Sequence, residues 1–350
     1  MSADGKLLSV VEHWLPRMEV GGIPTSTAKA IIARAGDWSG WLREWTAEGD
    51  RHAAHAEEAL AKGWRVTAGE GYARAAQLYH FGQFMAFEDL ALKEQAAARK
   101  CALYQLAAPL LDPPAEALEI PVDGGVLHAY LRLPASAGPA PLAVIVPGSD
   151  STKEEFSALE RVFLIRGIAT LSVDGPGQGE GRALGPLRPD IGPEIARVMQ
   201  RVQPDPRLSG RIGLVGMAFG GFLALRAASS LPDLAAVVSI NGFADLGAFG
   251  PTMPQVYRDN LRFAFATDAV LDYAKGFTLA GLDGPTCPAL ILHGGQDRIF
   301  PPSEAQASAN FCRGLVDLQV FADGNHVCNN IAWLYRPLVA DWLGDRLRSV

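Results

Sequence analysis

The sequence predicts an α/β fold, a mostly parallel sheet with helices on both faces, preceded by an all-helical domain. After residue 113, short apolar runs with little internal alternation are separated by helical patterns, as parallel strands covered on both faces would show. Before residue 113 the pattern is almost wholly helical, and Pro113 and Pro114 block its continuation. We therefore expect a helical domain over residues 1–112 and an α/β domain over residues 113–350.

Helices are expected throughout the N-terminal domain. Thr25 or Ser26 can cap a first helix, and Asp37 opens a second one whose apolar residues recur at helical spacing. Two further helices are predicted over residues 67–87 and 88–111. Aromatic residues at this spacing pack inside a core more often than they bind a ligand, so the stripe predicts helix packing.

The α/β domain is expected to open with a hairpin whose turn lies at residues 123–125. The predicted strands that follow cover residues 141–148, 169–174, 212–215, 235–240, 289–294 and 318–321. Helical patterns between and after these strands cover residues 153–166, 193–202, 221–230, 303–311 and 331–347. An antiparallel entry followed by strand–helix units is typical of a doubly covered sheet.

Composition excludes several classes of protein. A formal net charge of −7 disfavours nucleic acid as a partner, because phosphate binding requires clustered Lys and Arg. No apolar run reaches the roughly 18 residues that a membrane span requires, and the N-terminus lacks the pattern of a signal peptide. The four cysteines form no metal-binding spacing and are expected to be buried thiols. We expect a soluble cytoplasmic protein without a bound metal.

The segment Gly216–Gly220 carries the most informative pattern, a strand, a sharp turn and the start of a helix. It matches G-x-S-x-G, the nucleophile elbow of α/β-hydrolases, except that Ala218 stands where the serine is required. The glycines suit a turn too crowded for neighbouring Cβ atoms. The pattern predicts an elbow that lacks its attacking oxygen.

Two downstream loops supply the partners of such a nucleophile. Asp297 and His326 each follow a predicted strand, so that nucleophile position, acid and histidine occur in the order used by α/β-hydrolases. In these enzymes a histidine removes the serine proton and a buried carboxylate orients that histidine. Each residue alone would read as an ordinary loop residue, but their order and placement predict a catalytic triad with an α/β-hydrolase fold.

Two backbone amides are expected to form an oxyanion hole, one from Phe219 and one from Ser149 in the first strand–helix loop. The glycine-rich stretch Asp174–Glu180 forms another tight loop after a strand. No G-K-[ST] follows it, so it does not predict a phosphate site, and Asp174 is interpreted as a structural turn residue.

These motifs, together with Ser151–Glu155, Trp41–Trp45 and Tyr104–Leu111, resemble the family of 2,6-dihydroxypseudooxynicotine hydrolase. Its members are α/β-hydrolases with an N-terminal helical domain that cleave carbon–carbon bonds beside a ketone. The resemblance extends over nearly the whole chain and implies a Ser-His-Asp mechanism without a metal or organic cofactor. It also implies that the helical domain caps the substrate pocket and that the protein forms a homodimer.

Carried over to this sequence, the family's triad falls on Ala218, Asp297 and His326, and its oxyanion amides fall on Ser149 and Phe219. Candidate substrate-binding residues are Tyr72, His80, Phe81, Phe84, Asp150, Lys153, Asn241 and Met253. For the four cap residues among them, packing inside the helical domain is the competing interpretation.

The chain departs from the family pattern at Ala218, at residues 148–150 and in the apolar segment 247–254. A neutral aromatic or polyketide-like ketone, or an ester, fits these residues as well as a nicotine-derived substrate does. Three interpretations of Ala218 stay open: a hydrolase made inactive by a serine-to-alanine change, a natural non-hydrolytic binding protein or lyase, and a purely structural protein. Retention of Asp297 and His326 favours the first, a nucleophile-deficient hydrolase.

Overall fold

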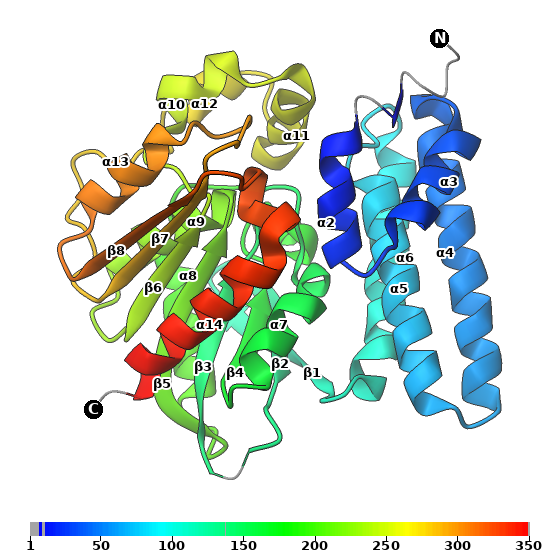
Figure 1. The fold of residues 1–350 in the computed structure, drawn as a ribbon, viewed down its shortest axis with the longest axis horizontal. Helices are drawn as coiled ribbons and strands as arrows, with labels where there is room; N and C mark the ends of the chain where they lie inside the picture. The colour runs from blue at the N-terminus through cyan, green and yellow to red at the C-terminus, as the bar shows by residue number, and fades with distance from the viewer. Residues whose placement is uncertain (1–6, 9–10, 137, 349–350) are drawn as a thin grey trace. The chain divides into compact units, whose positions relative to one another are not determined.

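The computed structural model describes residues 7–348 except residues 9, 10 and 137, and divides into two compact units (Figure 1). The helical unit contains the chain up to Ala117 together with Glu154–Ala158. The α/β unit contains Leu118–Lys153 and the chain from Leu159 onward. Sequence patterns did not indicate that a short segment from inside the predicted α/β domain belongs with the helices.

The helical unit is built from segments whose ends follow local capping chemistry. Its elements are η1 (Glu12–Trp14), α2 (Leu15–Val20), α3 (Thr25–Ala35), α4 (Trp38–Ala61), α5 (Arg65–Gln83), α6 (Leu90–Ala107) and η2 (Ala108–Leu110). As predicted, Asp37 caps α4, where its carboxylate accepts hydrogen bonds from the Ser39 and Gly40 amides. The first helix differs slightly, because Pro24 is the cap residue of α3 and Thr25 is already helical.

The tryptophan stripe of α4 packs inside this unit. Trp41 and Trp45 are almost completely buried, their ring centroids lie 5.2 Å apart, and Trp45 also packs on Phe81 of α5. Gly49 of α4 permits a close approach, since a Cβ there would lie 2.6 Å from the Tyr79 ring of α5. The stripe therefore serves helix packing, as the spacing predicted.

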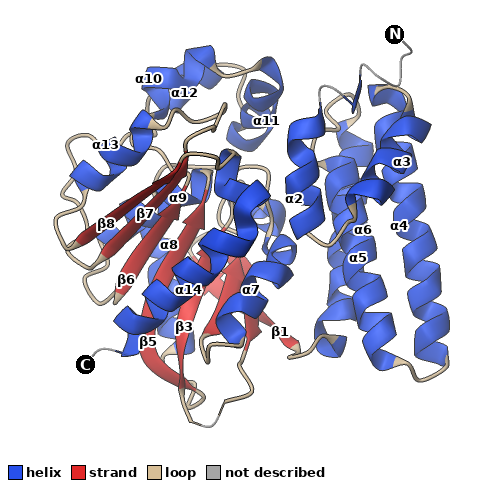
Figure 2. Ribbon diagram, viewed as in Figure 1, coloured by secondary structure: helices blue, strands red, loops and turns tan. Residues whose placement is uncertain are grey.

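The α/β unit is organised around an eight-stranded sheet, shown in red in Figure 2. Its strands are β1 (Ala115–Val122), β2 (Gly125–Arg132), β3 (Ala140–Val146), β4 (Ala169–Val173), β5 (Leu208–Met217), β6 (Ala236–Ile240), β7 (Ala289–Gly294) and β8 (Val316–Phe321). The strand order is β1-β2-β4-β3-β5-β6-β7-β8. The β2–β4 pair is antiparallel, whereas every pair from β4–β3 to β7–β8 is parallel. The predicted fold class is confirmed.

Helices cover both faces of this sheet, with α7 and α14 on one face and α8 and α9 on the other in Figure 1. The helical elements that follow β3 in the chain are η3 (Lys153–Phe156), α7 (Ser157–Leu164), η4 (Gly179–Leu184), α8 (Gly192–Val202), α9 (Phe219–Ser229), α10 (Leu246–Phe249), η5 (Gly250–Thr252), α11 (Gln255–Phe265), α12 (Val270–Ala274), α13 (Ser303–Phe311), η6 (His326–Ile331) and α14 (Ala332–Arg348). The elements α10, η5, α11 and α12 lie between β6 and β7, where no helices were predicted.

Backbone hydrogen bonds join the carboxyl ends of the parallel strands in series. The Ala218 amide after β5 donates to the Ile240 carbonyl of β6 over 2.8 Å. The Asn241 amide donates to Leu292 of β7 over 2.7 Å, and the Gly295 amide donates to Phe321 of β8 over 2.7 Å. The loops after β5, β6, β7 and β8 are therefore fixed along one edge of the sheet, where reactive groups of open α/β sheets gather.

Candidate active site

The turn at Ala218 retains the strained geometry of a nucleophile elbow. Ala218 has φ 51° and ψ −118°, a combination that side-chain-bearing residues rarely adopt. Such backbone costs on the order of 1–3 kcal/mol and persists only where the surrounding structure enforces it. The turn therefore keeps the conformation that presents a nucleophile, although alanine provides none.

The flanking glycines enforce this turn sterically. A Cβ at Gly216 would lie 2.0 Å from the Gly220 carbonyl oxygen, and one at Gly220 would lie 2.2 Å from the Val146 carbonyl oxygen. A Cβ at Gly148 would lie 3.6 Å from the Ala218 methyl group, so the loop after β3 packs directly against the elbow.

Asp297 and His326 form a hydrogen-bonded pair beside this edge of the sheet. Nδ1 of His326 lies 2.7 Å from Oδ2 of Asp297, which leaves Nε2 of His326 for another partner. The other carboxylate oxygen, Oδ1, accepts the Ile299 and Phe300 amides at 2.8 and 3.0 Å. The ring of Phe300 meets the His326 ring edge-on at 5.1 Å, which further restricts the imidazole. The structure thus brings together the two residues that were predicted as the acid and the base.

A buried asparagine completes the surroundings of the acid. Asn241, completely buried at the end of β6, donates from Nδ2 to Oδ2 of Asp297 over 2.8 Å. Burial alone would raise the pKa of the Asp297 carboxyl, but the charge and hydrogen bond of His326, with the hydrogen bonds from Asn241 and Ile299, lower it. Asp297 is therefore held as a carboxylate next to the imidazole.

Two further buried groups surround this carboxylate. The Cys328 thiol donates to Oδ1 of Asn241 over 3.5 Å, and burial together with the Asp297 charge raises the pKa of the thiol to about 12. Burial lowers the pKa of His293, whose Nε2 lies 3.2 Å from the Phe300 carbonyl. Both groups stay neutral near pH 7, and His326 is the imidazole that lies 2.7 Å from the Asp297 carboxylate.

Two backbone amides beside the elbow have no acceptor in the part of the chain that the structure describes. They belong to Ser149, in the loop after β3, and to Phe219, at the first position of α9. The Phe219 ring packs 5.0 Å from Phe243 and 5.1 Å from Phe277, which anchors the start of the helix. The Ser149 hydroxyl accepts a hydrogen bond from Nδ2 of Asn260 in α11 at 2.9 Å. These are the amides predicted to form an oxyanion hole.

Lys153 lies at the end of the same loop and takes part in a buried ionic cluster. Its ammonium is 3.0 Å from Oδ2 of Asp174 and also pairs with Glu180. Oδ1 of Asp174 accepts the Lys153 amide at 2.8 Å, and its Oδ2 accepts the Glu180 amide at 3.2 Å. The structure thus gives Asp174 the structural role predicted for it and places the Lys153 ammonium between carboxylates.

The other predicted substrate-binding residues fall in different surroundings. Asp150 is partly exposed in the loop after β3, and Met253 is buried in the core of the α/β unit. Tyr72, His80, Phe81 and Phe84 are buried residues of α5 or its end in the helical unit. Phe84 packs on Trp14 at 4.9 Å, and His80 stacks on Phe84 at 6.3 Å. The structure therefore brings Asn241 to Asp297, and gives the aromatic residues packing partners within the helical unit.

Within the helical unit, the segment Glu154–Ala158 is held by buried charges. Arg17 makes two hydrogen bonds to the Glu155 carboxylate at 2.6 and 2.8 Å, and Nε2 of His80 lies 3.3 Å from it. Lys100 pairs with Glu154 at 2.8 Å, and both side chains are 1% exposed. Burial opposes ionisation of Glu155, but the charges of Arg17 and His80 outweigh it and hold the pKa of Glu155 well below its usual range.

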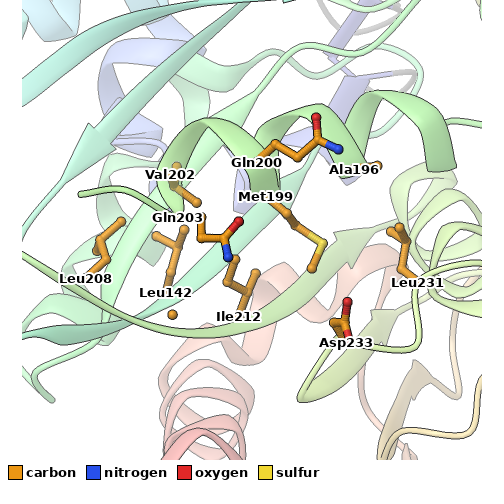
Figure 3. A pocket seen from close by; sticks show the side chains of 11 residues that line it. Leu142, Ala196, Met199, Gln200, Val202, Gln203, Leu208, Ile212, Leu231 and Asp233 are labelled. Atoms are coloured by element: carbon orange, nitrogen blue, oxygen red, sulfur yellow. The ribbon is translucent and has the colours of Figure 1, made fainter. Parts of the chain in front are cut away.

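A cavity of about 320 Å³ lies elsewhere in the α/β unit (Figure 3). Its wall is formed by the end of α8 and the first half of β5, including Met199, Gln203 and Ile212. Strands rise about 3.3 Å per residue, so Ile212 and Ala218 are roughly 20 Å apart along the chain. The cavity is therefore separate from the candidate active site.

Sequence reasoning missed several residues that organise the site. Gln178 is buried in the glycine-rich loop, and its side-chain amide donates to the Pro147 and Gly148 carbonyls at 2.6 and 3.0 Å. Asn260 on the unpredicted helix α11 contacts Ser149, and Phe300 packs on His326.

Among the described residues, no helix is long and apolar enough to span a bilayer.

A mostly parallel sheet with a strained elbow after β5, an acid after β7 and a histidine after β8 defines an α/β-hydrolase. Comparison with known families gives the same class: the chain belongs to the esterase FrsA-like family, whose model matches residues 29–268.

Individual relatives support this assignment. The chain is 34% identical to 2,6-dihydropseudooxynicotine hydrolase of Paenarthrobacter nicotinovorans over 88% of this chain and 84% of that protein. It is 33% identical to the alpha/beta hydrolase xenA of Xenoacremonium sinensis over 75% of this chain and 67% of that protein. The crystal structure of 2,6-dihydroxy-pseudo-oxynicotine hydrolase superposes with a TM-score of 0.86 at 31% identity, and the match covers 95% of each chain. The predicted family and fold are confirmed.

Proposed function

We propose that this chain is a carbon–carbon bond hydrolase whose nucleophile position is occupied by alanine, so that it binds its substrate without turning it over. The observation that carries the proposal is the intact Asp297–His326 pair on the same sheet edge as the strained elbow at Ala218. A structural protein would have no need for a buried carboxylate aligned on a histidine, or for an alanine held at φ 51°. The substrate class is a ketone with an acyl-aryl or 1,3-diketone-like group.

With serine at position 218, the arrangement supports acyl transfer. Nε2 of His326 would take the serine proton as the oxygen attacks the ketone carbon, while Asp297 stabilises the imidazolium. The amides of Ser149 and Phe219 would donate to the developing oxyanion. The carbon–carbon bond then breaks, the leaving carbon receives the proton from His326, and water activated by the same histidine releases the acid.

Carbon–carbon cleavage requires a substrate that stabilises its own leaving carbanion, because the residues described around the elbow supply only one acid–base pair. An electron-rich aromatic ring or a second carbonyl provides that stabilisation. The resemblance to 2,6-dihydropseudooxynicotine hydrolase supports this reaction, and the apolar segment 247–254 favours a neutral ring over a basic one.

Ester hydrolysis is the second candidate. The matching family model describes esterases, and serine attack on an ester passes through the same kind of tetrahedral intermediate. The two reactions differ in the leaving group, since an alkoxide departs from an ester and a carbanion from a ketone. A common elbow therefore serves either reaction, and substrates must distinguish them.

The test compares this chain with its Ala218→Ser variant on matched aryl ketones, 1,3-diketones and aryl esters. We expect the serine variant to hydrolyse one class at least ~10⁴-fold faster than the alanine form, because loss of a triad nucleophile costs at least that much. The alanine form should bind that substrate class with a similar dissociation constant. Equal, negligible turnover by both forms with every substrate would refute a hydrolase and favour a natural binding protein or lyase. Preference for aryl esters over both ketone types would replace the carbon–carbon assignment by the esterase one.

A further inference from the structure

The glycine-rich loop Asp174–Glu180 contacts the loop after β3 through one fully engaged side chain. Gln178 is 1% exposed and makes three hydrogen bonds. Its Oε1 accepts the Gly175 amide at 3.0 Å, while its Nε2 donates to the carbonyls of Pro147 and Gly148. Because each end of the side-chain amide meets the complementary backbone group, the orientation of this amide is fixed.

These bonds determine where the next backbone amide points. The only cis peptide bond in the described chain is Asp112–Pro113, so the peptide between Gly148 and Ser149 is trans. In a planar trans peptide the carbonyl and the N–H point in opposite directions. Holding the Gly148 carbonyl toward Gln178 therefore turns the Ser149 N–H away from Gln178, and this N–H has no acceptor among the described residues.

A second contact holds the far end of the same loop. Asp174 accepts the Lys153 amide and pairs with its ammonium, so the glycine-rich loop holds residues 147–153 at both ends. Gln178 acts at the Gly148 end, which packs against Ala218. The Asp174 contact is charged and buried. Gln178, by contrast, makes neutral hydrogen bonds, one of them to the carbonyl of the peptide between Gly148 and Ser149.

We propose that Gln178 is the positioning residue of the oxyanion hole: it holds the loop after β3 so that the Ser149 amide faces the reacting carbonyl. This inference rests on the proposed function for its catalytic consequence. Gln178 would not touch the substrate, and it would act only through the peptide between Gly148 and Ser149. Its effect should therefore appear in the chemical step rather than in substrate binding.

The test uses Gln178→Met, which removes the hydrogen bonds at similar volume, and Gln178→Glu, whose carboxylate cannot donate to two carbonyls. Gln200→Met, on the exposed side of α8, is the matched control. In the Ala218→Ser background we expect either Gln178 variant to lower kcat by about 10- to 100-fold, as a displaced oxyanion donor would. KM and the pH profile set by His326 should stay close to those of the control, whereas the melting temperature should fall, because both variants leave buried backbone groups without their hydrogen-bond partner.

Amide hydrogen exchange of residues 148–152, measured in the Ala218 chain as well, supplies a readout that does not need activity. We expect both Gln178 variants to exchange faster in this loop while the rest of the α/β unit is unchanged. If Ala218→Ser proves inactive, the proposed function fails, and the exchange data still decide whether Gln178 holds the loop. Unchanged loop exchange, or a kcat loss matched by the control, overturns the inference. A change confined to KM would also overturn it.

Discussion

The Oδ2 atom of Asp297 lies 2.7 Å from Nδ1 of His326 and, at the same time, 2.8 Å from Nδ2 of Asn241. One carboxylate oxygen therefore accepts from the histidine and from the asparagine, while the other oxygen accepts two backbone amides. Hydrogen bonds fix the orientation of the Asp297 carboxylate, and its lowered pKa keeps it ionised. The fold itself therefore aligns the carboxylate with His326.

Replacing the acid should remove most activity without removing the fold. In the Ala218→Ser background we expect Asp297→Asn to lower kcat by about 10⁴-fold, because an amide no longer selects the productive imidazole tautomer. Asp323→Asn, an exposed change in the loop that carries His326, is the control. Steady-state kinetics and thermal melting measure both effects. A loss smaller than tenfold would mean that Asp297 does not orient the base.

Adding a second carboxylate beside Asp297 should move the pH dependence of catalysis. Asn241→Asp would replace a hydrogen-bond donor by a second carboxylate, and the added negative charge should favour the protonated form of His326. In the serine background the acid limb of kcat/KM should therefore shift to higher pH, as a pH–rate profile would record. Asn241→Leu, which removes the donor without adding charge, is the comparison. An acid limb identical in the two variants would contradict the proposed influence of Asn241.

Glu155 should contribute to stability in a defined pH range. Its pKa in the folded chain lies well below the usual value of 4.5, so its stabilisation is present above that value and is lost as the pH falls toward the folded-state pKa. We expect Glu155→Gln to cost about 3 kcal/mol at pH 7, because it removes the carboxylate that pairs with the Arg17 guanidinium. Urea unfolding across pH should show this difference shrinking below pH 4.5.

The control for this experiment is Glu57→Gln, an exposed change on α4. Its unfolding free energy should differ little from that of the parent chain at every pH. A Glu155→Gln penalty that stays constant from neutral to acidic pH would show that shape, and not ionisation, accounts for the contribution of Glu155.

Crowding at the elbow should make Gly216 indispensable, whereas Gly250, which lies in η5 in open surroundings, should be replaceable. Gly216→Ala would place a Cβ 2.0 Å from the Gly220 carbonyl oxygen. This oxygen belongs to the backbone, so it cannot rotate away as a flexible side chain could. We expect a loss of about 3 kcal/mol in the free energy of unfolding, as for other overpacked sites. Gly250→Ala meets no atom closer than 3.8 Å and should be tolerated. Chemical denaturation compares the two, and equal stability would show that the elbow can relax.

Local chemistry explains most of what the sequence predicted correctly. Asp37 caps α4 by accepting hydrogen bonds from residues two and three positions further along the chain. The mainly apolar strands β6 and β7 indicate burial on both faces of the sheet. The elbow, Asp297 and His326 were found because the glycine pattern and the chain order reflect local constraints. These features depend on a few neighbouring residues and are therefore visible without a structure.

Residues whose role depends on distant contacts were not predictable. Gln178 looks like an ordinary residue of a glycine-rich loop, and only folding brings it to the carbonyls of the loop after β3. Asn241 was predicted to bind substrate, and its hydrogen bond to Asp297 was not predicted. Helix α11 has an apolar stripe that includes Tyr257, Leu261 and Ala264, but polar residues interrupt the segment and obscured it.

The fact that Glu154–Ala158 belongs to the helical unit has a consequence for biosynthesis. Helices α2 to α6 leave the ribosome before these residues, yet Arg17 and Lys100 require Glu154 and Glu155 as buried counter-ions. We therefore expect these helices to complete their packing only after β3 and the loop behind it have been translated. A fragment ending at Ala117 would lack the Glu154 and Glu155 carboxylates that pair with Lys100 and Arg17, although it contains every helix of the helical unit from α2 to α6.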